Sequence, residues 1–150
     1  MNGIAMKVEK MGFKSAKKIM EDHITQAKKS GKVYFSTDVG IAEKFLRQIE
    51  VVFFYNVKED MFYIGNVVRI EKRKIKGNRS TMDNAFIPED SDMFSVLEYA
   101  NEPRKTWILL ENIRVIDKSK FSEWKTISDN ITVAEKILQV GRYPRFYFVG

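Results

Sequence analysis

Residues 51–74, with the sequence VVFFYNVKEDMFYIGNVVRIEKRK, decide how this chain folds. Two runs of apolar and aromatic residues flank the charged sequence Lys58-Glu59-Asp60, and a basic cluster follows the second run. β-Branched and aromatic residues favour strands, and a few polar residues suffice to reverse the chain between two strands. The stretch therefore predicts a β-hairpin.

The two strands of this hairpin differ in their pattern. Residues 51–55 are apolar throughout, which is typical of a strand that is covered on both faces or curled into a barrel. Residues 61–70 alternate, with one face expected to carry Phe62, Ile64, Val68 and Ile70 and the other Met61, Tyr63, Val67 and Arg69. Gly65 interrupts the second run, and a glycine inside a strand indicates a bulge, a bend or a close backbone approach.

Further elements are predicted on both sides of the hairpin. Apolar residues at helical spacing indicate a helix over 15–29 that stops at Gly31. The other predicted elements are strands over 32–37, 106–116 and 145–149, short helices over 39–48 and 121–128, a final helix ending at Gly141, and a long polar loop over 74–92. Together they predict an α+β protein whose strands, about six in number, close into a small mixed barrel.

The composition bounds the class of protein. A chain of 150 residues, 44% hydrophobic and 13% aromatic, is expected to bury one core. The absence of cysteine excludes disulfides, thiolate metal sites and a cysteine nucleophile. The N-terminal residues lack the apolar run of a signal peptide, and no window suits a membrane span, so we expect a cytoplasmic protein with no membrane partner.

Basic residues exceed acidic ones by 26 to 20, for a net charge of +6. Residues 1–32 hold eight lysines against three acids, and the sequence Lys72-Arg73-Lys74-Ile75-Lys76-Gly77-Asn78-Arg79 adds five bases with no acid. Both segments suit either solvated surface or contacts to the phosphates of a nucleic acid, and the sequence leaves these alternatives open.

The order of elements resembles the PUA-like superfamily, with the EVE, YTH and ASCH branches nearest. The hairpin carries the resemblance, through the aromatic end Phe53-Phe54-Tyr55-Asn56 and through Gly65 before Val67-Val68-Arg69-Ile70. The resemblance covers residues 32–149, which implies an N-terminal helical extension over 1–31 and one barrel domain over 32–150. Members of the superfamily are mostly nucleic-acid binders, and the EVE and YTH branches hold a modified base in an aromatic and polar pocket. The early tryptophan of EVE domains has no counterpart here.

Catalytic groups are sparse in the sequence. The single histidine, His23, lies on the apolar stripe of a predicted helix, where a packed side chain is the commoner outcome, and one histidine without cysteine does not make the usual zinc sites. Glu89-Asp90-Ser91-Asp92 is an acidic cluster in a predicted loop without a recognised ligand spacing. No glycine-rich phosphate loop and no G-x-S-x-G motif occurs. We therefore predict no catalytic residue, no metal site and no cofactor.

Binding residues are better represented. A nucleobase pocket needs flat rings for stacking and polar groups that read a base edge. Hydroxyls stand at a predicted strand end, and two arginines flank a tyrosine before the last strand, a spacing that suits a phosphate clamp. The predicted nucleic-acid-binding residues are Ser36, Thr37, Tyr55, Asn56, Tyr63, Lys72, Arg73, Lys74, Lys76, Arg79, Trp107, Arg142, Tyr143 and Arg145.

Three functions follow from these features. The first is a non-catalytic module that binds DNA or RNA and recognises a modified base in an aromatic pocket. The alternative is a small protein-interaction module, such as a phage-type or host inhibitor that docks on a larger protein, because aromatic residues dominate interface energetics. The second alternative, an ASCH-like ribonuclease in which a lysine and a tyrosine or serine transfer protons, follows from the family resemblance.

Overall fold

The computed structural model describes residues 2–38, 41, 46–72, 85–123, 125 and 146–149. The chain is α+β, as predicted. Its elements are β1 (Gly3–Lys7), α1 (Ala16–Ser30), β2 (Val33–Thr37), β3 (Val51–Asn56), β4 (Met61–Lys72), α3 (Ser91–Phe94), β5 (Thr106–Val115), α4 (Lys118–Glu123) and β6 (Phe146–Val149). No helix in the described part of the chain has the length and apolar character needed to span a membrane.

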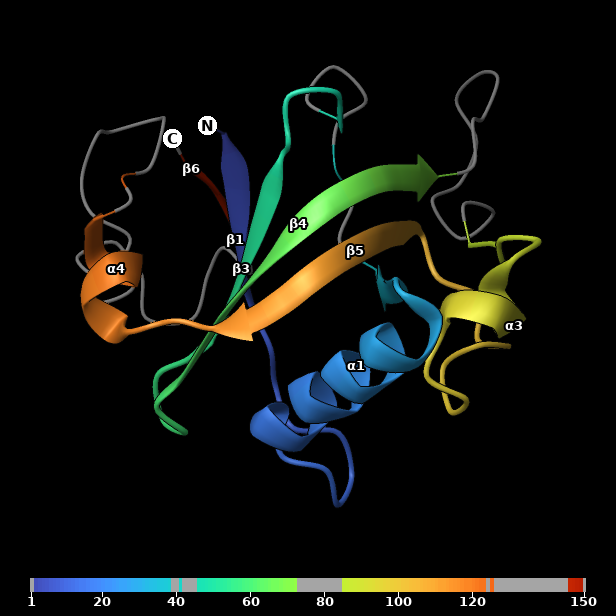
Figure 1. Ribbon diagram of the computed structural model, residues 1–150, viewed down its shortest axis with the longest axis horizontal. Helices are drawn as coiled ribbons and strands as arrows, with labels where there is room; N and C mark the ends of the chain where they lie inside the picture. Colours follow the sequence, from blue (N-terminus) through green and yellow to red (C-terminus); the bar gives the residue numbers. More distant parts are fainter. Residues whose placement is uncertain are drawn as a thin grey trace.

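The six strands form one mixed sheet in the order β2-β5-β4-β3-β1-β6. Strand β1 runs parallel to β3, and every other neighbouring pair is antiparallel. Figure 1 shows the long strands β4 and β5 side by side, with α1 lying across one face of the sheet. Strands β2 and β6 are the two edges, and within the described residues no pairing closes the sheet into a barrel.

The predicted hairpin is confirmed by strands β3 and β4. They pair with Asn56 opposite Met61, and Asp60 adopts a positive φ of 50° in the turn that joins them. All six residues of β3 are buried, and successive side chains enter different hydrophobic clusters. Strand β3 is therefore covered on both faces, as its continuous apolar run predicts.

Gly65 marks both a register shift and a close approach, as predicted. The pairing of β4 with β5 shifts between Ile64 and Asn66, and a Cβ atom at Gly65 would lie 3.2 Å from Cγ1 of Ile113. A second shift follows between Val67 and Arg69. The extra residue of the second shift lies in β4 and inverts the alternation of that strand, so the face predicted for Ile70 is wrong, and this side chain packs on the α1 side of the sheet.

The core lies on both faces of the sheet. The larger cluster fills the space between α1 and the sheet, and includes Ile19, Met20 and Phe54. On the opposite face, one cluster gathers around Phe121 of α4 and a second gathers around Trp107. Helix α1 begins after Ser15, whose side chain accepts a hydrogen bond from Lys18 N, and ends at Gly31 in the left-handed conformation, so the predicted start and stop are confirmed.

Strand β1 is the element that the sequence did not predict. It pairs with β3 and β6, and its residues Ile4 and Ala5 are fully buried. Residues 3–30 therefore belong to the same sheet and core, rather than forming an extension outside them. Helix α4 also lies earlier than the predicted 121–128 helix, and α3 begins inside the predicted 74–92 loop. The predicted 39–48 helix, most of the 74–92 loop and the final helix lie largely or wholly outside the described residues.

Candidate ligand-binding site

A cavity of about 380 Å³ lies where the chain following β1, helix α1 and the end of β2 meet. This volume falls in the range of small-molecule and cofactor sites, about 300–1,000 Å³. Strand β2 forms one edge of the sheet and β1 lies next to the other edge, so residues from strands that are far apart in the strand order line one cavity. The lining residues are Met6, Lys7, Val8, Glu9, Lys10, Met11, Ile19, His23, Phe35, Ser36, Thr37, Asp38, Tyr99 and Arg104.

His23 is the most buried polar side chain of the cavity wall, with 3% of its surface exposed. Its Nδ1 lies 2.7 Å from the carbonyl oxygen of Ile19. Since a carbonyl oxygen only accepts, Nδ1 carries the hydrogen and Nε2 carries the lone pair. Burial lowers the pKa of His23 below its usual 6.5, so the imidazole is neutral at pH 7. In the described part of the chain, no protein group is bonded to Nε2.

Two aromatic rings hold the imidazole in place. The centroid of the Phe35 ring lies 5.2 Å from that of the His23 ring. The Tyr99 ring stacks on the His23 ring, with centroids 5.8 Å apart and an interplanar angle of 21°. Phe35 is in turn fixed against Phe54 of β3, with centroids 4.6 Å apart. The cavity therefore combines flat π-surfaces with a fixed hydrogen-bond acceptor.

Charged residues of both signs surround the cavity. Arg104 donates to Asp38 at 2.8 Å and to Glu102 at 2.5 Å, and Lys7 lies 3.6 Å from Glu9. Lys10 forms no ion pair with any of the residues described. These pairs limit the net positive charge of the cavity rim.

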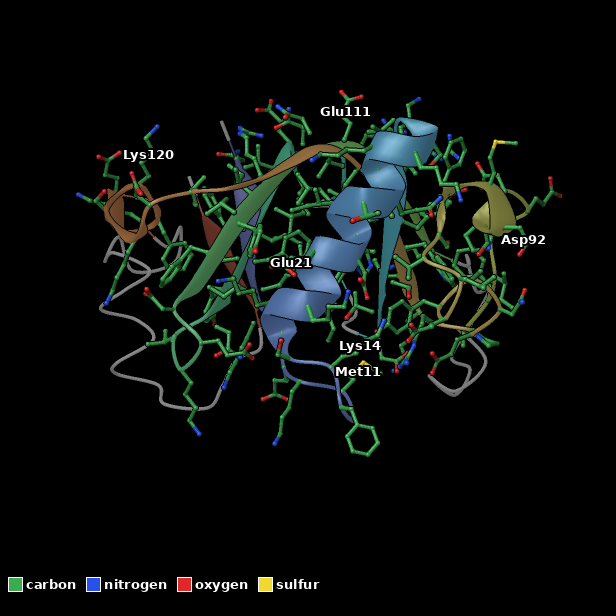
Figure 2. All side chains as sticks on the ribbon, turned by 60° about the horizontal axis from the view of Figure 1, so that its bottom comes forward. Met11, Lys14, Glu21, Asp92, Glu111 and Lys120 are labelled. Carbon is green, nitrogen blue, oxygen red and sulfur yellow. The ribbon has the colours of Figure 1, made fainter. Side chains whose placement is uncertain are left out.

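The segment between β1 and α1 ends in a tight turn beside the cavity. Met11 and Lys14 exchange two backbone hydrogen bonds of 2.9 and 3.0 Å, and Gly12 adopts a positive φ of 58° between them. Figure 2 shows Met11 and Lys14 next to the first turn of α1. Phe13, at the tip of this turn, is fully exposed.

Lys14 connects three segments near the cavity. Its Nζ donates to Asp22 of α1 at 2.6 Å and to Glu98 at 2.5 Å, and it lies 5.8 Å from the centroid of the Tyr99 ring. Lys18 adds a second ion pair to Asp22 at 2.8 Å. These contacts hold Tyr99 against α1. The hydrogen bonds from Lys14 and then Lys18 lower the pKa of Asp22.

Replacing Asp22 with asparagine is expected to lower the free energy of unfolding by about 1 kcal/mol at pH 7. A carboxyl group whose pKa is lower in the folded state stabilises above its unfolded pKa of about 3.9, and this contribution is lost as the pH falls through the folded value. Urea denaturation from pH 7 downward should therefore show the unchanged protein and Asp22→Asn converging in acid. A difference that stays constant with pH would contradict the assignment.

Two of the residues predicted to bind nucleic acid, Ser36 and Thr37, line the cavity. The three predicted rings in the described residues do not line it. Tyr55 packs against Phe121 on the face opposite α1, with centroids 5.4 Å apart, and Tyr63 is buried in the core beneath α1. Trp107 is fully buried, and its Nε1 donates to the carbonyl oxygen of Phe86 at 2.8 Å. These rings are core residues and do not border the cavity.

Two further predicted residues make structural contacts. Asn56 donates from Nδ2 to Val8 O at 2.8 Å and accepts from Glu59 N at 3.1 Å, which joins the hairpin turn to the end of β1. Lys72 donates from Nζ to Ile41 O at 2.9 Å. The remaining predicted residues, Arg73, Lys74, Lys76, Arg79, Arg142, Tyr143 and Arg145, lie outside the described residues.

Sequence reasoning missed His23, Tyr99 and Arg104 as members of the site. His23 carried a signal, since it is a polar side chain on an apolar helix stripe, but packing was the commoner interpretation. Tyr99 and Arg104 come from turns that follow α3, far from β1 and β2 in sequence. No local pattern relates them to Ser36 and Thr37, and only the folded chain brings them together.

The acidic cluster at residues 89–92 takes part in a separate polar contact. The hydroxyl of Tyr34 lies 2.5 Å from Glu71 and 2.7 Å from Asp90, and it accepts from Arg69 at 2.9 Å. Arg69 also forms an ion pair with Asp90. Within the described residues, no three His, Asp or Glu side chains gather where they would hold a metal ion. The cluster therefore ties the segment before α3 to the sheet.

Comparison with protein-family models, with curated proteins and with solved structures finds no match to this chain.

Proposed function

We propose that this protein is a non-catalytic nucleic-acid-binding module that takes one base into the cavity. The observation that carries the proposal is the neutral imidazole of His23, which contacts the rings of Phe35 and Tyr99 and whose Nε2 has no hydrogen-bond partner among the described residues. Single nucleotides are recognised by stacking on flat rings and by hydrogen bonds to a base edge. The cavity wall offers both kinds of contact.

The rim residues would contact the sugar-phosphate backbone. Lys7, Lys10 and Arg104 line the cavity, and basic side chains of this kind position a nucleic acid through its phosphates. Ser36 and Thr37 add hydroxyl groups from the edge strand β2. The predicted modification of the base belongs to the same proposal, since the apolar side chains of Met6, Val8 and Ile19 provide a surface that suits a methyl group.

The barrel of the PUA-like superfamily is also part of this proposal. The described residues form six strands, in agreement with the expected number. The cavity is bordered by β2, at one end of the strand order, and by the residues after β1, near the other end. The shared cavity supports a sheet that curves from one edge toward the other, which is what closure into a barrel requires.

Fluorescence anisotropy of short labelled DNA and RNA tests the proposal. The oligonucleotides are single- and double-stranded, with and without methylated cytosine or adenine, and are measured across a salt series. We expect binding that weakens as salt rises. Tyr99→Ala should weaken binding about 5- to 150-fold, the effect of removing one base-aromatic stack. Tyr99→Phe keeps the ring and should bind much like the unchanged protein.

Absence of binding at low salt would overturn the proposal and favour the protein-interaction module. The observation that favours a protein-interaction module is Phe13, a fully exposed aromatic ring on the turn before α1. Leu97 is exposed as well. Exposed aromatic side chains are the residues that anchor protein interfaces. Electrophoresis of the labelled RNA after incubation distinguishes the ribonuclease alternative, because a binding module leaves the RNA intact.

A further inference from the structure

We infer that Nε2 of His23 selects the base that enters the cavity, by requiring a ligand that presents an N–H group to it. The inference rests on the proposed function and goes further, because it names the edge of the base that is read. Exocyclic amino groups and protonated ring nitrogens supply such donors, whereas an edge with only acceptors or methyl groups does not.

The hydrogen bond to Ile19 fixes which nitrogen accepts. Nδ1 donates to the carbonyl oxygen at 2.7 Å, so the neutral ring has its lone pair on Nε2. Nε2 lies on the edge of the imidazole away from Cβ, and therefore extends away from the backbone of α1. A neutral histidine in this tautomer recognises donors and rejects acceptors.

The position of this acceptor is rigid. The imidazole contacts the rings of Phe35 and Tyr99, and Phe35 packs on Phe54 of the central strand β3. Lys14 contacts the Tyr99 ring, and its ion pairs with Asp22 and Glu98 fix its position there. A ligand that lacks the donor therefore leaves a buried acceptor unpaired, since the ring is not free to turn away.

Matched bases test the selection directly. The single-stranded oligonucleotides differ only in one central base, and two pairs of bases are compared. Adenine and purine differ by the exocyclic amino group alone. Uracil has a hydrogen on N3, which a methyl group replaces in N3-methyluracil. The unchanged protein should bind the donor-bearing member of at least one pair about 5- to 150-fold more tightly. Purine adds no bulk, so weaker binding of purine is not a steric effect.

His23→Phe is the matched variant. Phenylalanine keeps a flat ring between Phe35 and Tyr99 but has no acceptor, and Ile19 O keeps the backbone bond of the helix. Both members of each pair should then bind equally. Thermal unfolding followed by circular dichroism checks that the variant folds, and the comparison of bases on the unchanged protein stands without it.

The outcomes separate the inference from the proposed function. If the oligonucleotides bind but neither pair is distinguished, or if the preference survives in His23→Phe, the inference is overturned and the binding module stands. If none of the oligonucleotides binds at low salt, the proposed function fails and the inference fails with it.

Discussion

Trp107→Ala is expected to lower the free energy of unfolding by about 3–5 kcal/mol, the largest loss among the changes considered for this chain. Trp107 is fully buried on the face of the sheet opposite α1, and its ring contacts Tyr34 edge-on with centroids 5.7 Å apart. Alanine would leave a cavity beneath Phe86 and Phe94. Chemical denaturation followed by far-ultraviolet circular dichroism measures the loss.

Two variants make the test specific. Trp107→Phe keeps most of the ring but removes the Nε1 donor to the carbonyl oxygens of Phe86 and Arg104, so it should cost less than the alanine variant. Phe13→Ala removes an aromatic ring that is fully exposed, and should change stability by no more than about 0.5 kcal/mol. If Trp107→Ala were as mild as Phe13→Ala, the ring would not be a core residue.

Asn56→Asp is expected to lower the free energy of unfolding by about 3 kcal/mol at pH 7. The change replaces an Nδ2 donor, 2.8 Å from Val8 O, by an anionic oxygen that faces the same carbonyl group in a buried position. Asn56→Ala removes the contact without adding charge, and should cost about 1–3 kcal/mol. Equilibrium urea denaturation of the three proteins gives the differences.

The effect of Asn56→Asp should depend on pH. Burial raises the pKa of the introduced carboxyl group in the folded state, so the folded protein binds the proton more tightly than the unfolded chain does. The destabilisation therefore appears as the pH rises above the unfolded value of about 3.9, and is complete above the raised folded value. Below pH 4 the protonated carboxyl group donates to Val8 O, and the free energy of unfolding of the variant should approach that of the unchanged protein. Equal destabilisation at all pH values would mean that charge is not the cause.

The fold could be predicted where a pattern extends over several turns or a full strand. Strands β3 and β4 have dense apolar runs, and α1 has a helical stripe with a cap at each end, so each was predicted close to its observed bounds. Strand β1 was missed because it is short and buried on both sides, which leaves no alternation to detect. The face of Ile70 was predicted wrongly because the second register shift of β4 has no glycine or proline to mark it.

The site could be predicted only where polar residues end a strand. Ser36 and Thr37 follow the apolar start of β2, and such residues do line the cavity. Tyr55 and Trp107 are aromatic residues of the kind that line base-binding pockets, yet both are core residues. An apolar sequence pattern indicates that a ring is buried, but it does not indicate whether the buried ring borders a cavity. The cavity depends on Tyr99 and Arg104, which reach it through tertiary contacts.

The antiparallel pairing of β1 with β6 has a consequence for how the chain folds. Gly3 pairs with Val149, so the sheet joins the first and the last of the described strands, β1 and β6, which lie side by side in Figure 1. Contacts this far apart in sequence raise the contact order and slow folding, since a long loop is closed before the pairing is gained. During synthesis, one edge of β1 stays unpaired until β6 has left the ribosome. The interval in which the nascent chain exposes the unpaired N–H and C=O groups of β1 to other chains is therefore set by the synthesis of β6.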